Sequence, residues 1–137
     1  MKKLAIAAVA LSSLALAGCN LPTLNLQSSV DLNTEAGILS GYGLVVNAEN
    51  ALRANVDQGV VPLCKTGTLP SVSNICVKRS VMVQLQNADA KMNTTVNQMV
   101  AFTKAHPTVS PLQYISAAQD ALLAVQAVLN SAKPAGV

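Results

Sequence analysis

Apolar residues recur at helical spacing along three stretches of the chain. The most regular stripe alternates steps of four and three: Val81, Leu85, Ala88, Met92, Thr95, Met99, Phe102. This spacing places the stripe on one face of a helix that packs along its whole length. We expect the helix to begin between Asn74 and Ser80. It should stop at His106, because Pro107 disfavours helical geometry in the residue before it.

An earlier stripe predicts a first helix: Ile38, Tyr42, Val45, Leu52, Val56, with Glu49 in the remaining step. Asn33 or Thr34 can cap its start, and Gly59 supplies the left-handed residue that commonly ends a helix. A later stripe predicts a third helix: Leu112, Ile115, Ala118, Leu122, Val125, Leu129. Ser110 is expected to cap this helix, Pro111 suits its first position, and Gln113 completes a capping box.

The N-terminal region has the organisation of a secretory signal. Lys2 and Lys3 precede a 14-residue apolar run, 4–17, which is shorter than the roughly 18 to 20 residues of a membrane-spanning helix. The run ends in Leu16-Ala17-Gly18-Cys19, which resembles the lipobox of bacterial lipoproteins. The resemblance implies cleavage before Cys19 and lipid on its thiol. The alternative is an ordinary signal peptide, with Cys19 merely the first mature residue.

The residue after the lipobox cysteine bears on location. In Gram-negative lipoproteins an Asp there favours retention at the inner membrane, and here the residue is Asn20. The resemblance therefore implies a lipid-anchored protein of the bacterial envelope, at the outer membrane. With the first helix expected from Asn33 or Thr34, the chain divides into a signal peptide (1–18), a lipidated tether (19–32) and a bundle domain (33–137).

Once Cys19 is assigned to lipid, Cys64 and Cys76 form an even pair. In an oxidising compartment such a pair is usually a disulfide. The alternatives are a metal site with His106 or a redox-active dithiol. Cys64 and Cys76 are twelve residues apart, which is far from the Cys-x-x-Cys spacing of redox-active dithiols and of many metal sites. The one histidine is distant in the sequence, so it is a poor candidate for a third metal ligand.

The connections predict the fold class. The link between the second and third helices is only a few residues, which makes those helices antiparallel. The link between the first and second runs from Gln58 to about Lys78 and contains both cysteines. We therefore expect an all-α protein: an antiparallel three-helix bundle with a disulfide-stapled loop between its first two helices.

Composition excludes several function classes. Without residues 1–18 the chain has 119 residues, enough for one small domain, and its basic residues fall from 9 to 7 against 6 acidic ones. Tyr42, Phe102 and Tyr114 are the only aromatic residues, so few side chains are present on which nucleic-acid bases could stack. Binding of nucleic acid is not expected.

Few residues are candidates for chemistry. Glu49 lies in an apolar stripe, where burial would raise the pKa of its carboxyl group; the alternative is a pair with Arg53 at the stripe edge. His106 is expected to bond terminal carbonyls of its helix. The sequence contains no nucleophile elbow, zinc-protease pair, phosphate loop or dinucleotide fingerprint. We expect no enzyme, no cofactor and no metal.

One helix face is a candidate for interaction. Gly37 and Gly41 lie four residues apart beside Tyr42, which suits the close approach of a partner helix or a second copy. The alternative is that the helix starts later and the glycines belong to a linker.

Taken together, these features predict a small lipid-anchored helical module that contacts the membrane through its lipid and another envelope protein through its surface. A carrier or sensor of a small apolar ligand between the helices is the alternative. The motif Pro62-Leu63-Cys64 with a later Cys76, set between Ala-rich helices, is loosely similar to small helical lipoproteins of bacteria and their prophages. That similarity implies no activity.

Overall fold

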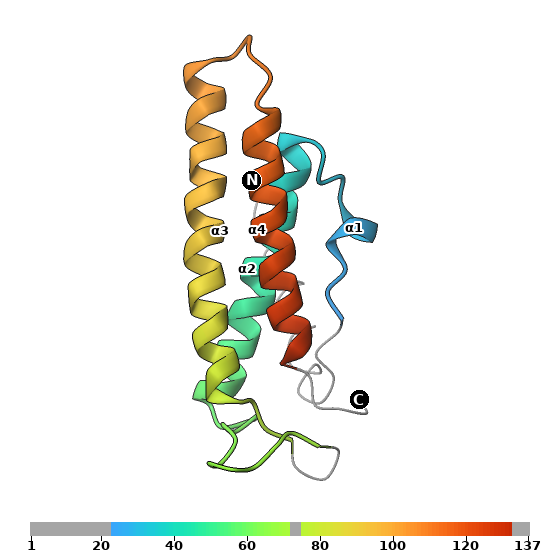
Figure 1. Ribbon diagram of the computed structural model, residues 1–137. Helices are drawn as coiled ribbons and strands as arrows, with labels where there is room; N and C mark the ends of the chain where they lie inside the picture. Colours follow the sequence, from blue (N-terminus) through green and yellow to red (C-terminus); the bar gives the residue numbers. More distant parts are fainter. Residues whose placement is uncertain (1–22, 72–74, 133–137) are drawn as a thin grey trace, which may run out of the picture.

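Three long helices pack side by side in alternating direction (Figure 1). The structure, a computed structural model, describes residues 23–71 and 75–132. Its elements are a short helix α1 (Leu26–Ser29) and the long helices α2 (Glu35–Asp57), α3 (Arg79–Ala105) and α4 (Leu112–Ser131). Helix α4 packs against both α2 and α3. The predicted all-α antiparallel three-helix bundle is confirmed.

Most helix ends follow from local chemistry. The Thr34 hydroxyl oxygen accepts the Gly37 N–H at 3.0 Å and caps α2, and Gly59 adopts a φ of 72° just after that helix ends. Helix α3 ends at Ala105, and His106 is no longer helical because Pro107 follows it. The cap predicted at Ser110 is wrong. Helix α4 begins at Leu112 without a side-chain cap.

The core is built from the predicted stripes. Met92 and Met99 of α3 and Leu122 and Val125 of α4 are fully buried, as are Ile38, Val45 and Leu52 of α2. Two positions differ from the pattern. Val96 rather than Thr95 is buried in α3, and the Thr95 hydroxyl instead donates to the Met92 carbonyl at 3.0 Å. Leu112, at the first position of α4, is exposed.

The loop between α2 and α3 is closed by the predicted disulfide. Cys64 and Cys76 are bonded, with their Cα atoms 4.9 Å apart. Beside the bond, the Cys64 N–H donates to the Val77 carbonyl at 2.9 Å, and the Val77 N–H donates to the Pro62 carbonyl at 3.0 Å. Val61 and Val77 are buried in the core. The loop is therefore fixed both to itself and to the end of the bundle.

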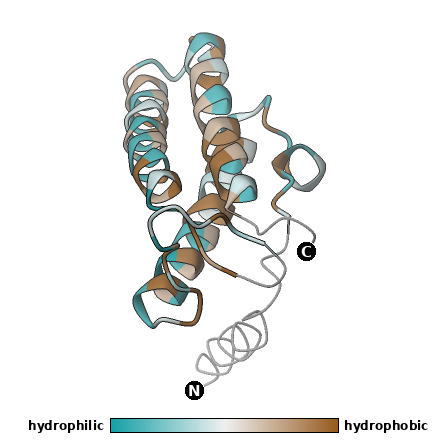
Figure 2. Ribbon diagram, turned by 60° about the horizontal axis from the view of Figure 1, so that its bottom comes forward, coloured by the Kyte–Doolittle hydropathy of each residue, from teal (hydrophilic) through white to brown (hydrophobic). Residues whose placement is uncertain are grey.

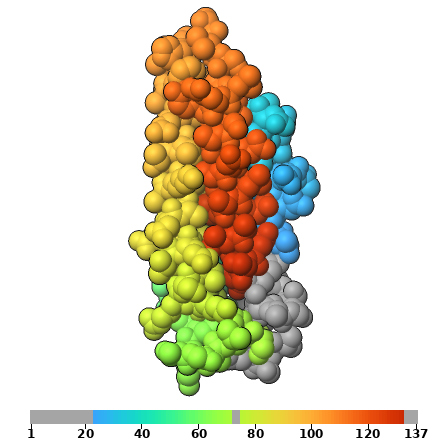
Figure 3. Space-filling view, viewed as in Figure 1, coloured from blue at the N-terminus to red at the C-terminus, as the bar shows by residue number. Residues whose placement is uncertain are grey.

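The segment before α2 packs on the bundle instead of forming a free tether. Leu26 is 0% exposed and Leu32 is also buried in the core. The backbone of Leu24 exchanges two hydrogen bonds with the Asn130 side chain, at 3.1 and 3.0 Å, and the Leu26 N–H donates to Gln126 Oε1 at 2.6 Å. Of the expected tether over 19–32, the part from Leu24 onward thus belongs to the domain (Figure 3).

This segment also explains the glycines of α2. A Cβ added at Gly37 would lie 1.5 Å from the Asp31 carbonyl oxygen. A Cβ at Gly41 would lie 3.1 Å from Leu32 Cδ2. Gly43, by contrast, has open space around the same position. Gly37 and Gly41 therefore admit the chain's own N-terminal segment against the helix.

Two glycine substitutions test this docking. We expect Gly37→Ala to destabilise the fold by about 1–3 kcal/mol, because the Asp31 backbone has to move. Gly43→Ala is the matched control in the same helix and should stabilise it by up to about 1 kcal/mol, the usual difference in helix propensity. Urea unfolding followed by circular dichroism measures both. Equal effects of the two substitutions would contradict the docking.

Candidate functional site

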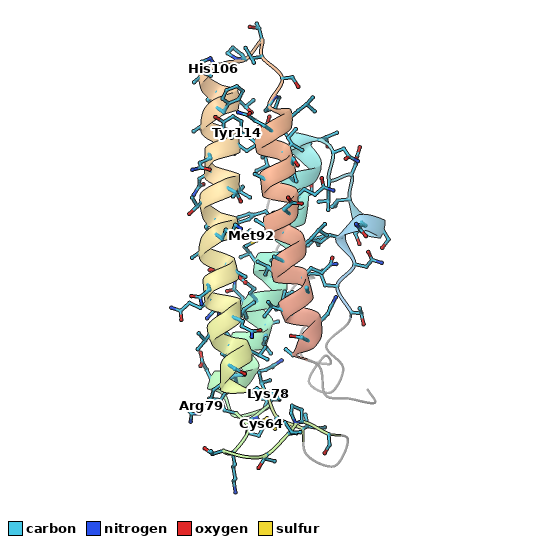
Figure 4. All side chains as sticks on the ribbon, viewed as in Figure 1. Cys64, Lys78, Arg79, Met92, His106 and Tyr114 are labelled. Carbon is cyan, nitrogen blue, oxygen red and sulfur yellow. A yellow bond between two sulfur atoms is a disulfide. The ribbon has the colours of Figure 1, made fainter. Side chains whose placement is uncertain are left out.

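The disulfide-stapled end of the bundle gathers exposed aliphatic and basic side chains. Val60, Leu69 and Ile75 are exposed, and Leu69 reaches 68%. Lys65, Lys78 and Arg79 are exposed as well. Figure 4 shows Lys78 and Arg79 at this end beside Cys64, and Lys65 follows Cys64 in the chain. We call these six residues the loop-end surface. Figure 2, in which this end of the bundle comes forward, shows hydrophobic segments of the loop in brown.

The N-terminal segment enters the bundle at this same end. Leu24 is bonded to Asn130, one residue before the last residue of α4, Ser131. A surface hollow joins the end of α4 to the loop: it is lined by Ser131 and Ala132, by Leu69 and Pro70 of the loop, and by Lys78, Ser80, Val81 and Gln84 around the start of α3. Leu24, near the start of the described residues, therefore lies at the end of the bundle that carries the loop-end surface. Cys19 itself and residues 1–18 lie outside the described residues.

The predicted interaction face on α2 is occupied. Gly37 and Gly41 are buried beneath residues 30–32, so a partner helix at these glycines would have to displace the chain's own segment. Tyr42 is half-buried, and its hydroxyl donates to the Asn93 side-chain carbonyl of α3. Tyr42 thus joins two helices of the bundle. The alternative that α2 starts later is wrong, since the helix begins at Glu35.

A line of polar side chains crosses the contact between α2 and α3. Asn93 accepts from Tyr42 and donates through its Nδ2 to Asp89 Oδ1 at 3.1 Å. Asp89 in turn shares a hydrogen bond with the carboxyl group of Glu49. We call Tyr42, Asn93, Asp89 and Glu49 the polar seam. Sequence analysis singled out Glu49 but gave no sign of its partners, since Asp89 and Asn93 look like ordinary surface residues of α3.

Glu49 is the group in the seam whose surroundings are most unusual. It is 4% exposed, and among the described residues its Oε1 is a buried oxygen without a hydrogen-bond partner. Burial, together with the hydrogen bond and the negative charge of Asp89, raises the pKa of Glu49 to about 7, and the positive charge of Arg53 opposes this shift. A shared hydrogen bond between two carboxyl groups requires one proton. In the folded protein Glu49 is therefore protonated below about pH 7 and shares the proton only part of the time at neutral pH.

The end of the bundle opposite the loop carries the histidine. The His106 ring lies 4.8 Å from the Phe102 ring, which stacks at 4.4 Å on Tyr114 of α4. The His106 N–H donates to the Phe102 carbonyl at 2.8 Å, so its backbone closes α3. Its predicted bond to terminal carbonyls is thus made by the main chain. His106 is far along the bundle from the disulfide, as Figure 4 shows.

The described residues contain no group of three or more His, Cys, Asp or Glu side chains that could hold a metal ion. None of the helices in the described part of the chain is both long and apolar enough to cross a membrane. Comparisons of the chain with protein families, curated proteins and solved structures find no match.

The raised pKa of Glu49 predicts how stability depends on pH. A carboxyl group with a higher pKa in the folded state than its ordinary 4.5 stabilises the fold fully below pH 4.5. This contribution declines as pH rises and is lost above about 7. We expect Glu49→Gln, which stays neutral, to match the wild type at low pH and to be more stable by up to roughly 3 kcal/mol at about pH 8.

Urea unfolding at several pH values measures the effect. Glu35→Gln is the matched control, because it removes a glutamate from the first turn of the same helix and leaves the polar seam intact. A wild-type free energy of unfolding that runs parallel to that of Glu49→Gln across this pH range would contradict the assignment.

Proposed function

We propose that this chain is a lipid-anchored protein of the bacterial envelope that works as a small interaction and structural module. The lipobox resemblance at Leu16-Ala17-Gly18-Cys19 supplies the anchor. The helical bundle is the part that the anchor holds near the membrane. Contact with another envelope protein is the activity that follows from such a module.

The observation that carries the proposal is the docking of Leu24 and Leu26 on α4. Only 24 − 19 = 5 residue steps separate Cys19 from Leu24, so even a fully extended chain spans about 17 Å between them. Because Leu26 is buried and its N–H is bonded to Gln126, this short link ends on a rigid body. The bundle is thus held close to the bilayer, with its direction restricted.

The other end of the bundle is the natural place for a partner. The turn between α3 and α4 points away from the point where the chain leaves the bundle (Figure 1). It exposes Val109 and Leu112 beside polar residues. An apolar pair of this kind suits a small contact with a protein.

Replacing Cys19 tests the anchor. We expect Cys19→Ala to abolish the added mass of the acyl chains and to move the protein out of the membrane fraction, because the thiol that carries the lipid is gone. Intact-mass spectrometry and fractionation of native envelopes measure the two effects. A pull-down from the same envelopes should recover a partner with the wild type and lose it with the mislocalised variant.

The matched control is the double variant Cys64→Ala with Cys76→Ala, which removes the disulfide and leaves Cys19 in place. It should keep the lipid mass. A wild-type protein whose mature mass shows no acyl chain would refute the anchor outright.

A further inference from the structure

The loop-end surface lies at the same end of the bundle as Leu24, from which only five residue steps lead back to Cys19. We propose that this surface, formed by Val60, Leu69, Ile75, Lys65, Lys78 and Arg79, rests on the anionic surface of the bilayer. The inference rests on the proposed lipid anchor. It adds that the bundle touches the membrane with a defined end, through residues other than the lipidated cysteine.

The position of the chain exit gives the first argument. Leu24 is bonded to Asn130 near the last turn of α4, and the next residue of that helix, Ser131, lines a surface hollow together with Leu69 of the loop. The lipid therefore emerges within about 17 Å of a point that adjoins the loop. With so short a link, the stapled loop is the part of the bundle brought nearest to the lipid.

Charge gives the second argument. Between residues 57 and 80 the described charged residues are Lys65, Lys78 and Arg79 against Asp57, a balance of 3 − 1 = +2. At the opposite end Asp31 and Glu35 outnumber Lys104, a balance of 1 − 2 = −1. Basic residues near an anionic lipid surface strengthen membrane attachment, and acidic ones do not. The sign of the charge thus matches the end from which the lipid emerges.

The exposed aliphatic side chains give the third. Val60, Leu69 and Ile75 protrude from a loop that the disulfide and the Cys64–Val77 hydrogen bond hold in place. Side chains held outward in this way enter the boundary between headgroups and acyl chains with little loss of conformational freedom. Leu112 is equally exposed at the far end, so exposure alone does not choose between the ends. The chain exit and the charge do.

A pair of tryptophan substitutions tests the proposal. The chain contains no Trp, and Leu69 and Leu112 are matched in exposure, at 68% and 67%, at opposite ends of the bundle. The acylated full-length products of Leu69→Trp and Leu112→Trp are placed in vesicles of phosphatidylcholine with phosphatidylglycerol. Brominated acyl chains in the same vesicles quench any tryptophan that enters the bilayer surface.

We expect bromination to lower the emission of Leu69→Trp by about twofold and to leave that of Leu112→Trp nearly unchanged. Adding Lys65→Gln and Lys78→Gln should weaken the quenching of Leu69→Trp, most clearly at low salt, since the attraction is electrostatic. Equal quenching at both positions, stronger quenching of Leu112→Trp, or no quenching at either would overturn the proposal. The proposal would also be overturned if the loop crosslinked to an envelope protein while the tryptophan of Leu69→Trp stayed unquenched in vesicles.

The intact mass of each sample separates this proposal from the proposed anchor. A protein that carries acyl chains while Leu69→Trp stays in water retains the anchor and refutes the membrane-facing loop. A protein without acyl chains refutes the anchor, and the comparison of the two tryptophan positions still decides whether the loop touches the bilayer.

Discussion

The burial of Leu26 is the interaction on which the arrangement of this protein depends. Its side chain is fully buried in the core, and its N–H donates to Gln126 of α4. The residues on either side of Leu26 also lie on the bundle, and the backbone of Leu24 is hydrogen-bonded to the Asn130 side chain. It also determines why α2 has Gly37 and Gly41, which leave room for residues 30–32. The place where the chain leaves the bundle, and therefore the end that lies nearest the proposed lipid, follows from it.

The polar seam shows a second constraint, which acts against stability. Glu49 occupies a position in the stripe of α2 where an apolar side chain would otherwise pack, and one of its oxygens has no partner among the described residues. Protonation and the hydrogen bond with Asp89 offset part of the cost of burying it. The contact between α2 and α3 is therefore sensitive to pH, whereas α4 packs on both helices mainly through buried apolar side chains such as Leu122 and Val125. Helix α4 packs on both α2 and α3, which contact each other much less.

Local patterns predicted what local chemistry determines. The sequence predicted the stripe from Val81 to Phe102, the helix end before Pro107, a cap at Asn33 or Thr34 and the Cys64–Cys76 pair. Each of these depends on neighbours in sequence or, for the cysteines, on their even number. The docking of Leu24 and Leu26 was not readable. Its partners lie 106 and 100 residues away, and the polar residues around Leu26 are typical of a linker. The glycines were the one available sign, and their spacing indicates a close approach without showing which segment makes it.

Amide hydrogen exchange of Leu26 in the full-length chain tests the central claim most directly. If the segment is docked, the Leu26 N–H, bonded to Gln126 and buried, should exchange about as slowly as the amides of the α4 core around Leu122. If Leu26 exchanges at the rate of an unstructured chain while Leu122 stays protected, the segment is a free tether. The bundle would then have no fixed end toward the membrane.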